Sequence, residues 1–275
     1  EVHANIRQLT TSLRTSGKEV AFKVNSKLEL DVWEDDAPTI FNNKQVGLSL
    51  ELLYDKQRNL LTLQPSTLQL NEARFATKGT VDFAHDTSVN IHISGDKPDF
   101  SLLTAFAPAA VATTLSRYKN EGRVYFRGLI NGPLAGGQTP AVDVEFGCEN
   151  AWFLNAGVNK KLDALTLTGR YTNGTGRSLT TSELHLTQFS ARPEEGVFEG
   201  RLFIRNFKDP FIKVDLHADL DLDFIGKFFQ LQQLEHIQGK IKLDMRFDEL
   251  VDLNFPASNL ARLKKGIDSE LSIEN

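Results

Sequence analysis

Apolar and polar residues alternate along most of the chain, the pattern of β-strands with one buried face. Residues 46–52 place Leu48, Leu50 and Leu52 on one side. Residues 79–94 repeat the pattern in two strands whose apolar positions are Val81, Phe83, Val89, Ile91 and Ile93. A pairing slip of one residue would turn this whole apolar set outward, so we expect a well-specified register.

Other stretches depart from the alternation. Residues 98–118 and 224–236 read as two short helices; Asp99 or Ser101 would cap the first and Pro108 would kink or split it. Residues 1–16 carry Val2, Ile6, Leu9 and Leu13 at intervals of three to four, which predicts a short amphipathic helix. Asn173-Gly174 predicts a tight hairpin turn.

The order of these elements recurs. Two hairpin strands, a short helix and a new strand begin at Gly79 and again at Gly200, about 120 residues later, as expected for a modular array. We therefore predict a single elongated β domain over residues 1–275, with internal repeat units at roughly 46–131 and 162–253. The chain starts at Glu1 and its only methionine is Met245, so we expect a fragment of a larger protein.

The predicted fold class is mainly β: a long curved antiparallel meander, forming an open or taco-like trough, with two short capping helices. Such a sheet must bury its apolar face. It can fold on itself, close into a barrel, or be covered by helices or by an apolar ligand. A closed core is one interpretation of the inward-facing set. That set is Leu48, Leu50, Leu52, Val81, Phe83, Ile91, Ile93, Leu202, Ile204, Val214, Leu216, Ile241, Leu243 and Met245.

Composition and motifs argue against several functional classes. A net charge of −5 and a pI near 5.7 do not indicate a nucleic-acid partner. The single cysteine, Cys148, excludes an internal disulfide framework, and no Cys/His cluster indicates a metal. Alternate aspartates in residues 215–223 would lie about 6.6 Å apart along a strand, too far apart to share a metal ion. We interpret them as the solvent-exposed face of that strand. No catalytic motif or cofactor fingerprint is present, so we expect no catalytic residues, no cofactor and no enzyme activity.

The repeated segments also carry a family resemblance. They read G-T-V-D-F and V-N-I-H-I-S-G-D at 79–83 and 89–96, their echo G-R-L-F-I and V-D-L-H at 200–204 and 214–217, and the restart I-Q-G-K-I-K-L at 237–243. Over roughly residues 46–253 the chain resembles the C-terminal region of the bacterial AsmA family, Bacteroidetes type. That family is related to TamB and to the repeating β-groove lipid-transfer proteins.

The resemblance implies a non-enzymatic protein of the periplasm, held in the inner membrane by an N-terminal anchor that we expect to lie outside this sequence. It further implies phospholipid binding and transport in outer-membrane and envelope biogenesis, with phospholipid or another acyl-chain lipid, and other envelope proteins, as partners. The residues expected to line the lipid groove are Val81, Phe83, Ile91, Ile93, Leu202, Ile204, Val214 and Leu216. The alternative is a structural or partner-docking β-sandwich module with a dry core.

Overall fold

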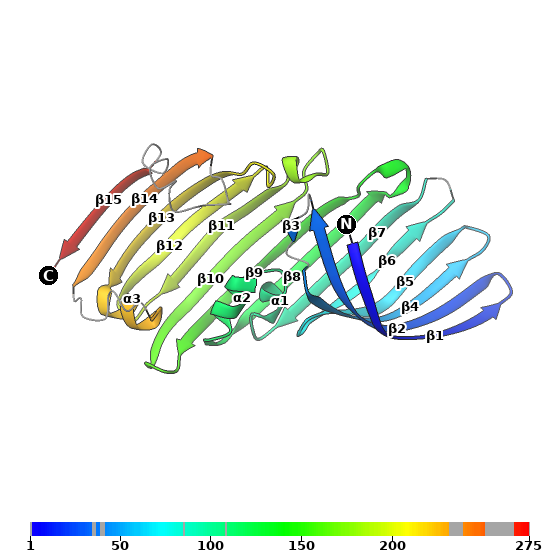
Figure 1. Ribbon diagram of the computed structural model, residues 1–275, viewed down its shortest axis with the longest axis horizontal. Coiled ribbons are helices and arrows are strands. Elements are labelled where there is room, and N and C mark those ends of the chain that lie inside the picture. The colour runs from blue at the N-terminus through cyan, green and yellow to red at the C-terminus, as the bar shows by residue number, and fades with distance from the viewer. Residues whose placement is uncertain are drawn as a thin grey trace. The chain divides into compact units, whose positions relative to one another are not determined.

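The computed structural model describes residues 2–34, 37–38, 42–84, 86–107, 109–230, 239–250 and 267–274 (Figure 1). The strands of the first half are β1 (Val2–Ser16), β2 (Glu19–Glu34), β3 (Ala37–Pro38), β4 (Lys44–Asp55), β5 (Leu60–Leu70), β6 (Ala73–Asp82), β7 (Ser88–Lys97) and β8 (Lys119–Pro133). Those of the second half are β9 (Ala141–Asn155), β10 (Lys160–Thr172), β11 (Glu183–Arg192), β12 (Gly196–Arg205), β13 (Phe211–Asp221), β14 (Lys240–Leu250) and β15 (Ile267–Glu274).

The strands form one open sheet in which nearly every strand lies beside its neighbours in sequence. The order runs from β1 through β2 and β4 to β15, and β3 pairs with β2. Within the described residues β1 and β15 are the two ends of this order, so the sheet does not close on itself. The predicted mainly β, antiparallel meander is confirmed (Figure 1).

The described residues hold three short α-helices where two short helices were predicted. The first helical region is divided into α1 (Ser101–Thr104) and α2 (Ala109–Leu115), on either side of Pro108, which itself lies outside the described residues. The second region contains α3 (Leu222–Phe228), and residues 231–236 of the predicted helix also lie outside the described part. Each helical region follows a hairpin, β6–β7 or β12–β13, and precedes a new strand, β8 or β14.

The chain divides into two compact units. Unit 1 comprises residues 1–115 and 125–144, and unit 2 comprises residues 116–124 and 145–275. These boundaries differ from the repeat units predicted at 46–131 and 162–253. The single elongated domain and its repeats stay predictions.

The helix predicted for residues 1–16 is wrong: this stretch is strand β1. Its register with β2 shifts between Ile6 and Gln8, so one extra residue, Arg7, forms a bulge. The bulge resets the alternation and brings Val2, Ile6, Leu9 and Leu13 to the same face of the strand. The spacing of three to four residues between these apolar positions therefore reflects a bulged strand and not a helix.

The prediction of a tight turn at Asn173-Gly174 is also wrong, because the connection between the two strands is longer. Strands β10 and β11 do pair as an antiparallel hairpin, with Thr172 opposite Glu183, so residues 173–182 form the connection. The loop folds back on itself, and the Thr181 hydroxyl donates a hydrogen bond of 2.8 Å to the carbonyl of Asn173. A Cβ on Gly174 would lie 1.9 Å from the carbonyl oxygen of Thr181, so this close approach requires glycine.

Candidate functional site

In unit 1 the strand register places the predicted apolar residues of β6 and β7 on one sheet face, called here the inner face. Val81 lies opposite Val89, and Ile91 and Ile93 lie opposite Gly79 and Thr77 on the same face. Val81, Ile91 and Ile93 are half-buried. Phe83 is 44% exposed and packs edge-on against the ring of Tyr54, with 6.4 Å between ring centroids.

The inner face of unit 1 continues across β5, β4 and β2. Register pairs such as Leu52 with Leu63, and Leu48 with Leu68, keep the apolar side chains on that side from strand to strand. All of the following inner-face residues are half-buried rather than closed off: Phe22, Val24, Leu28, Leu48, Leu50, Leu52, Leu61, Leu63 and Leu68. Unit 1 thus presents a broad apolar face that its own described residues cover only in part.

A helical segment covers the part of this face at β6 and β7. Helix α1 contacts both strands, and its Leu102 is fully buried beside Gly95. The Phe106 ring stacks on Phe126 with 4.9 Å between ring centroids, and Phe75 meets both rings edge-on. This aromatic cluster closes one region of the inner face and leaves the leucine-rich region on β4 and β5 more open.

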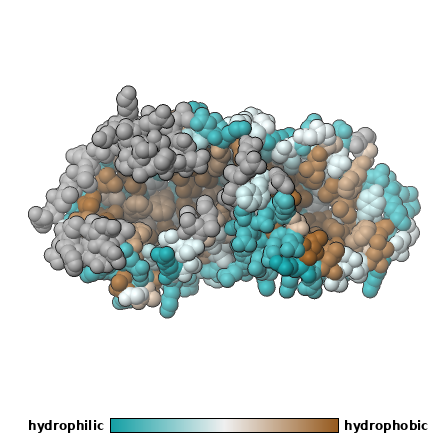
Figure 2. Space-filling model, in the orientation of Figure 1, coloured by the Kyte–Doolittle hydropathy of each residue, from teal (hydrophilic) through white to brown (hydrophobic). Residues whose placement is uncertain are grey.

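Unit 2 repeats the arrangement with its own inner face. Leu202 lies opposite Val214, Gly200 opposite Leu216, and Ile204 opposite Ile212. The four predicted residues among them, Leu202, Ile204, Val214 and Leu216, are all half-buried. Beyond β13 the face continues to Met245 and Phe247 on β14. Figure 2 shows apolar residues, in brown, gathered in hollowed parts of the surface over unit 1 and over unit 2.

Helix α3 packs on β10 and β13 of unit 2. It buries Leu222, Phe224 and Phe228, and the carboxylate of Asp221 caps it by accepting a 2.9 Å hydrogen bond from the Phe224 N–H. The carbonyl oxygen of Phe228 accepts two side-chain hydrogen bonds, from the Tyr118 hydroxyl at 3.1 Å and from Asn155 Nδ2 at 2.9 Å. Burial raises the pKa of Tyr118, consistent with its packing under the helix.

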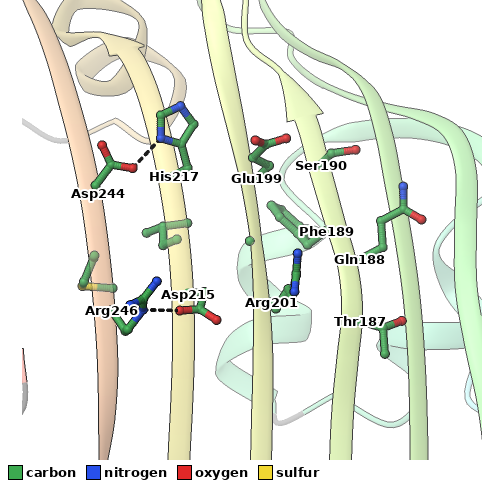
Figure 3. A pocket seen from close by; sticks show the side chains of 13 residues that line it. Thr187, Gln188, Phe189, Ser190, Glu199, Arg201, Asp215, His217, Asp244 and Arg246 are labelled. Carbon is green, nitrogen blue, oxygen red and sulfur yellow. Dashed lines mark hydrogen bonds and ion pairs between the residues drawn. The ribbon is translucent and has the colours of Figure 1, made fainter. Parts of the chain in front are cut away.

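The opposite face of β11 to β14 is polar and holds an open pocket of about 710 Å³ (Figure 3). His217 Nδ1 lies 2.6 Å from Asp244 Oδ1, and Arg246 Nε lies 3.1 Å from Asp215 Oδ1. The hydrogen bond to Asp244 raises the pKa of His217 above its ordinary value. Within the described residues no group of His, Cys, Asp or Glu side chains is arranged to hold a metal ion.

Three features escaped the sequence reasoning. His217 has a carboxylate partner on the next strand, which only the register of β13 with β14 reveals. Tyr118 and Asn155 anchor α3 from elements remote in sequence. Lys44 begins β4 on the inner face opposite Leu30 and is 7% exposed. Extending the alternation of residues 46–52 back by two positions would have found that lysine.

Comparison with known proteins gives no relative for this chain: no family model, no curated protein and no solved structure matches it. Of the helices in the described residues, none has the length and apolar character that crossing a bilayer requires.

Proposed function

We propose that the inner face of each unit binds the acyl chains of lipids, and that the protein acts by binding or conducting them rather than by catalysis. The observation that carries this proposal is a wide sheet face on which apolar side chains stay on the same side from strand to strand and remain partly exposed in both units. Soluble proteins rarely leave a large contiguous apolar surface exposed unless it meets a partner or a ligand.

The energetics favour an acyl chain as that ligand. Each methylene removed from water contributes about 0.8 kcal/mol, so even a partly covered chain gains several kcal/mol from a few contacts. The groove-lining residues would be those expected from the sequence: Val81, Phe83, Ile91 and Ile93 in unit 1, and Leu202, Ile204, Val214 and Leu216 in unit 2. The lipid head group would lie beside the sheet edge or a strand end.

The resemblance to the AsmA family supports the same proposal from the sequence side. On that basis the lipid would be a phospholipid, the compartment the periplasm, and the wider role envelope biogenesis at the outer membrane. The full-length protein would be anchored in the inner membrane by an N-terminal segment.

The test places a charge on each inner face and the same charge on the polar face nearby. Ile91→Lys is compared with Asn90→Lys on the same strand, because Asn90 is exposed on the other side. Val214→Lys is compared with Val197→Lys, because Val197 lies opposite Asp219 on the polar face. Each variant is checked for folding by circular dichroism and then assayed for copurifying lipid and for uptake of a fluorescent phospholipid.

We expect both inner-face variants to lose bound lipid and both controls to retain it. Folded inner-face variants that hold as much lipid as the wild-type protein would show that the groove assignment is wrong.

A partner-docking module is the second candidate, and β1 favours it: Val2, Ile6, Leu9 and Leu13 are 57–66% exposed on the strand that ends the described sheet order. That candidate predicts loss of a protein complex on substitution of β1, with no change in lipid binding.

A further inference from the structure

Lys44 is a buried cation on an apolar surface. Its register partner on β2 is Leu30, and Val46, two residues further along β4, lies on the same inner face between Leu28 and Leu70. The lysine is 7% exposed, and the inner-face positions next to it on β2 and β4, Leu28, Leu30 and Val46, are apolar. Burying an ammonium group is unfavourable unless a hydrogen-bonded counter-ion accompanies it.

No such counter-ion is present among the described residues. Lys44 makes no hydrogen bond or ion pair with any of them, and burial alone lowers the pKa of its ammonium group. The two carboxylates nearest on β2 are engaged elsewhere: Asp31 Oδ1 accepts a hydrogen bond from the Asn43 N–H at 2.6 Å, and Glu29 pairs with Arg7 at 2.7 Å. Both alternate with Leu30 along β2, so the register places them on the opposite face.

We propose that Lys44 binds the anionic head group of a single-chain or double-chain amphiphile whose acyl chain lies along the inner face of unit 1. This inference rests on the proposed function and adds to it the charge of the ligand and the position of its head. An anionic oxygen beside Lys44 would supply, through a charge-assisted hydrogen bond, the counter-ion that none of the described residues provides.

The strand is long enough for the chain. From Lys44 the inner-face positions of β4 continue through Val46, Leu48 and Leu50 to Leu52. Eight residues of extended strand span about 26 Å. One acyl chain occupies half of a bilayer core that is about 30 Å thick, or about 15 Å. A head group at Lys44 therefore leaves apolar strand for a whole chain.

The experiment measures binding of three probes to the 275-residue protein by calorimetry: dodecyl phosphate, dodecanol and inorganic phosphate. The variant Lys44→Met removes the charge and keeps an unbranched apolar side chain. Lys27→Met is the matched control, since Lys27 is exposed on the polar face of β2. Lys44→Arg keeps the charge, and thermal unfolding establishes that every variant is folded.

We expect Lys44→Met to bind dodecyl phosphate at least about tenfold more weakly than the wild type, while its affinity for dodecanol is unchanged. Lys27→Met should match the wild type, and Lys44→Arg should retain the preference for the anion. Inorganic phosphate should not bind measurably, because it lacks the chain.

Three results would overturn the inference, and they are distinguishable. Equal affinity of the wild type and of Lys44→Met for dodecyl phosphate, with dodecanol also bound, would show that Lys44 does not bind the head group. The proposal that the inner face binds acyl chains would still hold. Binding of inorganic phosphate as tight as that of dodecyl phosphate would mean a plain anion site. Failure of both alkyl probes to bind any folded variant would overturn the proposed function together with this inference.

Discussion

The docking of α1 on the inner face of unit 1 gives a double-mutant test. Leu102 is fully buried, so Leu102→Ala removes side-chain contacts and leaves a cavity, at a cost of about 3–5 kcal/mol in unfolding free energy. A Cβ on Gly95 would lie 2.8 and 3.1 Å from the two Cδ atoms of Leu102 and 3.4 Å from Phe75 Cδ1. Gly95→Ala alone should therefore overpack the site and cost about 1–3 kcal/mol, offset in part by about 0.5–1 kcal/mol from the restricted unfolded chain.

The two changes should compensate when combined. The methyl group that Gly95→Ala adds would enter space that Leu102 vacates, so the double variant should be more stable than the sum of the single effects by about 1 kcal/mol or more. Urea denaturation followed by circular dichroism measures all three variants. Leu13→Ala is the control, since Leu13 is 60% exposed and the same substitution should there cost only about 0.5 kcal/mol. Single effects that add within about 0.5 kcal/mol would refute the contact between α1 and β7.

Three further results are expected. Asn155→Ala should lower the unfolding free energy by about 1–3 kcal/mol, because Asn155 is 5% exposed and donates to the carbonyl of Phe228; an unchanged melting temperature would contradict this anchor. The pKa of His217 is raised by its hydrogen bond to Asp244, so the pair's stabilisation should be complete below the unfolded pKa near 6.5 and disappear as pH rises through the folded pKa. An NMR titration in which Asp244→Asn leaves that pKa unchanged would argue against the pair. Cys148 is buried and its pKa is raised to about 12, so native protein should resist iodoacetamide at about pH 8 and react in urea; rapid labelling of the folded protein would contradict the burial.

The sheet was predictable from the sequence because its alternation has a period of two. The parity of residues 79–94 was sufficient to place Val81, Ile91 and Ile93 on one face, and the register bears that placement out. The parity of residues 200–216 did the same for Leu202 and Val214. Whether these residues line a lipid groove stays a proposal.

Local irregularities and remote contacts were beyond such reasoning. A bulge at Arg7 imitates a helical interval, because one inserted residue shifts the apolar positions by one without changing the face they occupy. The loop at residues 173–182 depends on how Thr181 folds back, which a two-residue signal does not encode. Asn155 and Phe228 lie 73 residues apart, and alternation along each segment says nothing about which segments meet.

Native mass spectrometry of the purified wild-type protein, followed by organic extraction and lipid analysis, tests the central claim most directly. We predict a bound species whose mass matches a phospholipid or another acyl-chain lipid, which is absent from Ile91→Lys and Val214→Lys. A folded wild-type protein that carries no lipid, and takes up none from phospholipid vesicles, would contradict the account and favour a surface that meets another protein.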